Sequence, residues 1–118
     1  MVPKAGLEPA RISTVDFEST ASTDFATSAL KRYAENVVDK LSFGSISLPR
    51  LLAQEGTPET ITLCGLCTDI CVISNAMILK SAFPETPIRV VSGACAGVTE
   101  KSHETALAAM EAVQINVI

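Results

Sequence analysis

The sequence predicts an α/β fold in which helices cover a parallel β-sheet. From residue 30 onward, short apolar segments typical of strands alternate with segments whose apolar residues recur at helical spacing. Prolines, glycines and hydroxyl residues mark the boundaries between them. Strands that alternate with helices are joined by right-handed crossovers, which produce a parallel sheet with helices packed on it. We therefore expect a three-layer α/β/α architecture.

The first helix signal follows Ser45 and Ser47, either of which is a candidate N-cap, and Gly56 is the expected stop. The segment before it, 33–40, fits a helix by its spacing and equally a short strand over 36–38. The remaining elements are expected in this order: a strand over 60–66, a helix over 69–82, a strand over 87–91, a helix capped by Ser102 or alternatively Thr99, and a strand over 115–118.

Composition excludes several classes of partner. The 118 residues carry 9 Lys plus Arg against 13 Asp plus Glu, a net charge of −4, so there is no basic excess for binding nucleic acid. No apolar run approaches the roughly 20 residues of a membrane-spanning helix. Charged residues near the N-terminus leave no room for a secretory signal, which predicts a cytoplasmic protein. In that compartment the four cysteines are expected to be thiols.

The chain divides into two parts by composition. Residues 1–29 are rich in Ser, Thr, Ala and charged side chains, and their few large apolar residues follow no period. We expect this segment to be a disordered tail or a sequence unrelated to the domain that follows. Residues 30–118 carry the strand and helix signals and form the predicted domain.

One segment combines a strand end with a reactive side chain. Residues 65–72, read as Gly-Leu-Cys-Thr-Asp-Ile-Cys-Val, pass from the carboxyl end of a predicted strand into a helix, where α/β folds bind ligands. Cys71 falls in the first helical turn, where backbone N–H groups favour a thiolate. It is the best candidate nucleophile, against the alternative that it is a small buried apolar residue.

The other cysteines allow further interpretations. Cys64 and Cys67 form a Cys-x-x-Cys pair, but a redox pair opens a helix and Cys64 lies inside a predicted strand. A zinc site needs about four converging ligands, and only Cys71, Cys95 and His103 remain. Cys95 is better explained as a packed core thiol, and His103 as a residue at the start of a helix.

Residues 61–118 resemble the carboxyl-terminal half of the isochorismatase-like cysteine hydrolases, of the nicotinamidase and N-carbamoylsarcosine amidase type. The segment 65–72 matches the family pattern Gly-x-x-Thr-Asp-x-Cys-Val. Ala94-Cys95-Ala96 and Ser102-His103-Glu104 match further family positions, and the segment 39–45 resembles the one that carries the family's active-site lysine, here Lys40.

The resemblance implies a mechanism for these residues. Cys71 would attack a carboxamide carbonyl, release ammonia and form a thioester that water hydrolyses. The Leu66–Cys67 peptide bond would be cis, and the N–H groups of Cys67 and Cys71 would form the oxyanion hole. Lys40 would stabilise the thiolate. The implied partner is a small amide substrate, and self-association into a homo-oligomer is expected.

The sequence departs from the family in its first part. The family begins with a strand that carries a catalytic aspartate in a motif like Asp-x-Gln-x-Asp-Phe, followed by metal ligands in the nicotinamidases. Asp16-Phe17 and Asp24-Phe25 repeat only a dipeptide of it, and no hydrophobic strand precedes either. We therefore expect no metal or other cofactor, a missing first strand that leaves a sheet edge uncovered, and weak or absent turnover. The alternative function is a non-catalytic fragment or a protein-association module.

Overall fold

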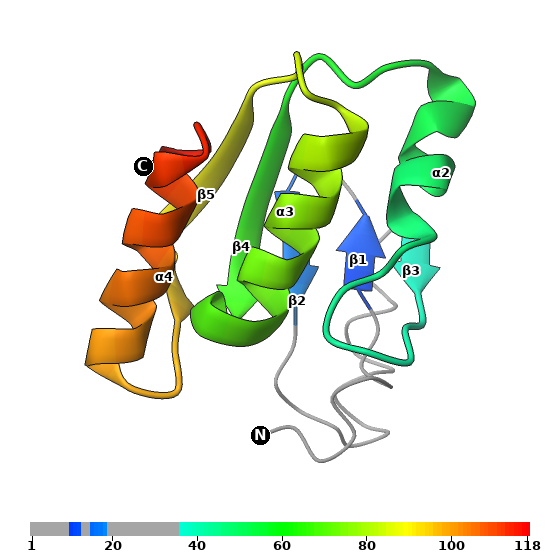
Figure 1. The fold of residues 1–118 in the computed structure, drawn as a ribbon. Coiled ribbons are helices and arrows are strands. Elements are labelled where there is room, and N and C mark those ends of the chain that lie inside the picture. The colour runs from blue at the N-terminus through cyan, green and yellow to red at the C-terminus, as the bar shows by residue number, and fades with distance from the viewer. Residues whose placement is uncertain (1–9, 13–14, 19–35) are drawn as a thin grey trace.

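A mixed six-stranded sheet organises the residues described by this computed structural model, which are 10–12, 15–18 and 36–118. The strand order is β3-β1-β2-β4-β5-β6 (Figure 1). The strands are β1 (Ala10–Ile12), β2 (Val15–Glu18), β3 (Asn36–Val38), β4 (Ile61–Leu66), β5 (Ile88–Ala96) and β6 (Asn116–Val117). Within 33–40, the ambiguous segment therefore contains the strand over 36–38 and not a helix at those positions.

The sheet is parallel from β2 to β6. β2 pairs in parallel with β4, β4 with β5 and β5 with β6, whereas β1 runs antiparallel to both of its neighbours. β2 and β4 are in register from Val15 beside Thr62 to Glu18 beside Gly65. The expectation that β4 would have an uncovered edge is therefore wrong, because β2 lies along it.

In the described part of the chain, three helices pack on one face of the strands. They are α2 (Leu48–Leu52), α3 (Ile73–Ala82) and α4 (Glu100–Ala112); a 3₁₀ turn, η2 (Ala53–Glu55), extends α2, and a π-helical turn, η3 (Thr68–Val72), precedes α3. Figure 1 shows α3 in front of β4 with α4 beside it. Along the sequence, β3, β4, β5 and β6 lie progressively further across the sheet in one direction. Right-handed crossovers between them therefore place the helices α2, α3 and α4 on the same side. The described residues thus supply two of the three predicted layers.

Helix boundaries follow local capping chemistry. Gly56 has φ 101° after η2, as expected for the residue that stops a helix. Thr99, not Ser102, caps α4: the Ser102 N–H donates to Thr99 Oγ1 at 3.0 Å, and Ser102 Oγ in turn accepts from the Thr99 N–H. Ser102 is the third residue of the helix in a capping box. The alternative prediction for this cap was therefore the right one.

The core lies between the helices and the sheet. Its members are apolar residues contributed by β4, β5, α2, α3, α4 and the segment before β6, and all are nearly solvent-free. They include Leu48, Leu63, Leu79, Ile88, Val90, Met110 and Ile115. Alternate residues of β5 are buried up to Val90, so Ile88 and Val90 face the core while Arg89 is exposed. This layer fixes α3, and with it the helix start that carries Cys71.

The N-terminal segment differs from its prediction where it is described. Residues 10–12 and 15–18 form strands of the sheet, although a disordered or unrelated tail was expected over 1–29. The rest of that segment, including Asp24 and Phe25, lies outside the described residues. In the part of the chain that is described, no helix has the length and apolar character required to cross a membrane.

Candidate active site

The chain makes a tight transition from β4 to the following helix. Gly65 is buried and has φ 122°, a conformation that strains any residue with a side chain. The next peptide bond, Leu66–Cys67, is cis. The Cys67 carbonyl then accepts hydrogen bonds from the N–H groups of Ile70 and Val72, both at 3.1 Å. The helical turn therefore begins directly after the strand and places Cys71 within it.

Cys71 and Lys40 meet in the interior. Lys40 Nζ lies 3.6 Å from Cys71 Sγ, and the two residues are 4% and 1% exposed. Lys40 comes from the loop after β3, and Cys71 from the turn η3. The Lys40 amine donates this hydrogen bond to the Cys71 sulfur. The structure brings together the two side chains that the sequence assigned to the site.

Two buried polar residues near Cys71 were missed by the sequence interpretation. Thr68 is fully buried and Asn75 is 3% exposed. Asn75 follows Cys71 by four positions, a spacing that places both on one side of the helix. This spacing, together with an amide inside an apolar helical pattern, is the signal that identifies Asn75.

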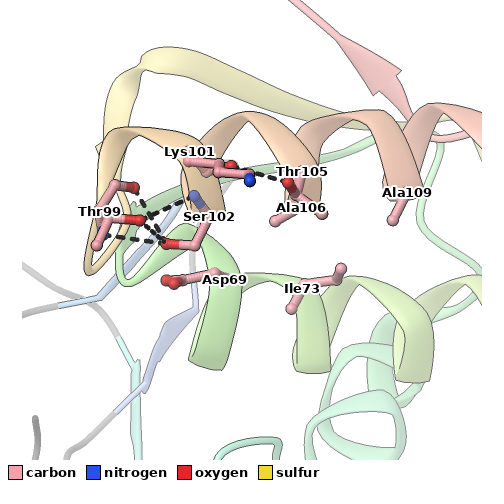
Figure 2. A pocket seen from close by; sticks show the side chains of 8 residues that line it. All are labelled: Asp69, Ile73, Thr99, Lys101, Ser102, Thr105, Ala106 and Ala109. Atoms are coloured by element: carbon pink, nitrogen blue, oxygen red, sulfur yellow. Dashed lines mark hydrogen bonds between the residues drawn. The ribbon is translucent and has the colours of Figure 1, made fainter.

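Residues at the start of α4 are tied to the turn that carries Cys71. Thr68 Oγ1 and His103 Nδ1 are 2.7 Å apart, and the Asp69 carboxylate accepts from the Val98 N–H at 3.2 and 3.3 Å. Figure 2 shows Asp69 beneath Ser102, at one end of a groove of about 500 Å³. The groove lies between α4 on one side and η3 with the start of α3 on the other. His103, expected only at a helix start, thus also contacts the motif.

Two of the remaining thiols lie on the central strands β4 and β5. Cys64 is buried within β4, and Cys95 pairs with Gly65 across β4 and β5. Burial raises the pKa of the Cys95 thiol, and a hydrogen bond from the Gly65 backbone opposes that rise. Among the described residues, no three His, Cys, Asp or Glu side chains gather to hold a metal ion.

A family model for the isochorismatase domain matches residues 2–118. The chain belongs to the isochorismatase family. The match includes most of the segment 1–29, which had been expected to lie outside the domain. No curated protein matches the chain significantly.

Solved structures of similar fold carry amidase names. They include a pyrazinamidase/nicotinamidase from Streptococcus mutans, with 26% identity, TM-score 0.61, and coverage of 69% of this chain and 45% of that one. A nicotinamidase from Staphylococcus aureus has 23% identity, TM-score 0.66, and coverage of 88% and 70%. A pyrazinamidase of Pyrococcus horikoshii in complex with zinc has 22% identity, TM-score 0.60, and coverage of 68% and 45%.

This isochorismatase family member is shorter than the proteins it matches. It spans 45% of the Pyrococcus and Streptococcus chains. At identities below 25%, the Staphylococcus and Pyrococcus structures establish the α/β fold alone.

Proposed function

We propose that this chain hydrolyses a small carboxamide through a thioester on Cys71. The contact between Lys40 Nζ and Cys71 Sγ, 3.6 Å long and almost fully buried, is the observation that carries the proposal. A cysteine becomes a strong nucleophile when a neighbouring cation and a helix start stabilise its thiolate. Both features meet at Cys71.

The proposed reaction has two steps. In the first, Cys71 Sγ attacks the carbonyl carbon, the C–N bond breaks, and the nitrogen takes up the proton given up by the Cys71 thiol and leaves as ammonia. In the second, water attacks the thioester, which releases a carboxylic acid and returns the thiol. The backbone N–H groups of Cys67 and Cys71 are the proposed donors to the oxyanion that forms in each step.

A small aromatic amide is the substrate class to test first. The structural neighbours are called nicotinamidase and pyrazinamidase, which supports nicotinamide and pyrazinamide as probes. The chain spans less than half of two of these proteins, so its own residues do not define the shape of the group attached to the amide.

Turnover by this chain is proposed to be slow. The sequence lacks the Asp-x-Gln-x-Asp-Phe motif that supplies the proton acceptor in the family it resembles. Catalytic groups that act as a unit are strongly non-additive, so the loss of one removes most of the rate. The strand β2 nevertheless brings Asp16 into register with Leu63 on β4, which makes this residue the one to test.

The decisive experiment separates acylation from turnover. The full chain is incubated with nicotinamide or pyrazinamide, ammonia is measured, and acid-quenched samples are analysed by mass spectrometry for an acyl group on Cys71. We expect an acyl adduct that Cys71→Ala abolishes, with ammonia release limited to a slow rate. If no acyl adduct forms and ammonia does not rise above the Cys71→Ala background, amide hydrolysis is rejected.

A second candidate function, protein association, has one observation in its favour. Leu41 and Ile46, in the loop that carries Lys40, are 88% and 87% exposed. Exposed apolar side chains of this kind favour self-association, and we propose a homo-oligomer. A monomer in sedimentation at micromolar concentration would contradict it.

A further inference from the structure

The position of the Lys40 ammonium depends on how its loop is held. A lysine side chain has a flexible four-carbon stem, so its charge stays near a partner only when the backbone is fixed. Leu41 and Phe43, which follow Lys40, are 88% and 49% exposed and contribute little packing. The loop must therefore be anchored at another residue.

That anchor is a buried hydrogen bond to α3. The Ser45 N–H donates to Asn75 Oδ1 at 2.8 Å, and both residues are 3% exposed. A buried backbone N–H that loses its acceptor is energetically costly, so the bond holds Ser45 against the helix. Ser45 is five positions after Lys40.

The backbone of the loop also lies directly on α3 at this point. A Cβ added to Gly44 would stand 2.6 Å from Ile78 Cδ1 and 3.3 Å from Ser74 Cβ. A Cβ here would require the end of the Ile78 side chain to shift, which shows how closely the loop backbone approaches α3. Gly44 and Ser45 together bring the loop to the side of α3 that presents Asn75.

Asn75 and Cys71 share one side of the same helical segment. They are four residues apart, which places them about one turn from each other. One helix therefore presents both the proposed nucleophile and the acceptor that fixes the loop of its cationic partner. Lys40 Nζ lies 3.6 Å from Cys71 Sγ on this segment.

We propose that Asn75 is a positioning residue that holds Lys40 against Cys71 through the Ser45 backbone. The proposal rests on the proposed function in one respect, the assignment of Cys71 as the nucleophile. The proposed role of Asn75 is indirect. It acts through the loop, so its effect on the thiol requires Lys40.

The test is the pH dependence of Cys71 alkylation by iodoacetamide, resolved by tandem mass spectrometry on the full chain. Four proteins are compared: the unchanged chain, Asn75→Ala, Lys40→Met and the double variant. We expect each single variant to alkylate Cys71 about tenfold more slowly at neutral pH and to move the midpoint upward. In the Lys40→Met background, Asn75→Ala adds no further shift, because coupled sites are non-additive.

Ser74→Ala is the matched control. It removes a side-chain hydrogen bond from the neighbouring position of α3, to the Ile70 carbonyl at 2.6 Å, and keeps the Cβ that faces Gly44. We expect the alkylation midpoint of this variant to equal that of the unchanged chain. A shift like that of Asn75→Ala would mean that any disturbance of α3 is sufficient, and the proposal would be wrong.

Two other results would overturn it. Equal shifts from Asn75→Ala with and without Lys40 would show that Asn75 acts on Cys71 directly, and an unshifted midpoint in a folded variant would remove its role. If Asn75→Ala does not fold, hydrogen exchange at the Ser45 amide of the unchanged chain decides: exchange as fast as in an unstructured peptide contradicts the anchor, and protection supports it. If the chain releases no ammonia but the midpoint of Cys71 alkylation still depends on Lys40, amide hydrolysis is rejected and the positioning role of Asn75 is not.

Discussion

Thr68 Oγ1 and His103 Nδ1 are 2.7 Å apart and join the turn that carries Cys71 to the first turn of α4. Thr68 is fully buried, and His103 is half-buried. The two residues are 35 positions apart, on segments that follow neighbouring parallel strands. Parallel strands place their carboxyl ends at one edge of the sheet, and this contact exists because β4 and β5 end together.

Removal of this contact is expected to destabilise the domain. In Thr68→Val the side-chain volume is kept but the hydroxyl is lost, so His103 loses its buried partner. We expect the free energy of unfolding to fall by about 1–2 kcal/mol in urea titrations. Thr105→Val is the control, since its hydroxyl bonds to the Lys101 carbonyl on an exposed helix face, and its change is expected within about 0.5 kcal/mol. Equal losses in the two variants would contradict a special role for the contact.

Gly97 is expected to tolerate no side chain. A Cβ at this position would stand 2.9 Å from the His103 backbone nitrogen and 3.0 Å from its Cα, and backbone atoms of a packed helix yield less readily than a side-chain end. We expect Gly97→Ala to cost about 1–3 kcal/mol in thermal or urea unfolding. Gly93→Ala, whose Cβ would meet no atom within 4 Å, should cost less. A Gly97→Ala variant as stable as Gly93→Ala would show that α4 can shift at its start.

Cys95 is expected to react only at raised pH. Because burial raises the pKa of its thiol, a smaller fraction is thiolate at any pH below that value than in the unfolded chain. Its alkylation midpoint should therefore lie higher in the folded protein than in urea. As the pH rises, the unfolded chain releases this proton first, so the folded state loses stability in alkaline solution. A folded midpoint at or below the unfolded one would contradict the effect of burial.

Asp16→Asn tests whether β2 supplies an acid. We expect the slow release of ammonia to change less than about threefold, because the sequence around Asp16 lacks the rest of the motif. Glu18→Gln, two positions along the same strand and in register with Gly65, is the matched control. A loss of a hundredfold or more in Asp16→Asn alone would place the acid on β2, and the prediction of an incomplete catalytic set would be wrong.

Local sequence patterns predicted the elements from residue 45 onward well, because their signals are short-range. Gly56 stops a helix through its own backbone freedom, and the apolar periodicity of 69–82 matches η3 and α3. The cap of α4 was less certain, since Thr99 and Ser102 are both good caps by composition. Only their reciprocal hydrogen bonds distinguish them.

The strand β2 could not be read from its residues. Val15–Glu18 alternates apolar and acidic residues, but over only four positions, which is too short a run to distinguish a strand from a loop. Its place in the sheet comes from pairing with β4. The paired residues, such as Val15 and Thr62, are about 47 positions apart in the sequence. Pairing of this kind depends on the partner strand and not on local propensity.

The sequence by itself determined the α/β class, the thiol at a helix start and the residues proposed to act with it. Cys71 was identified from its place in residues 65–72, and Lys40 from its similarity to a family segment. Only the tertiary structure decided that Lys40 Nζ lies 3.6 Å from Cys71 Sγ, and that the Ser45 N–H donates to Asn75 Oδ1. A sequence specifies which groups are available, whereas their distance depends on the packing of a loop against a helix 31 residues later in the chain.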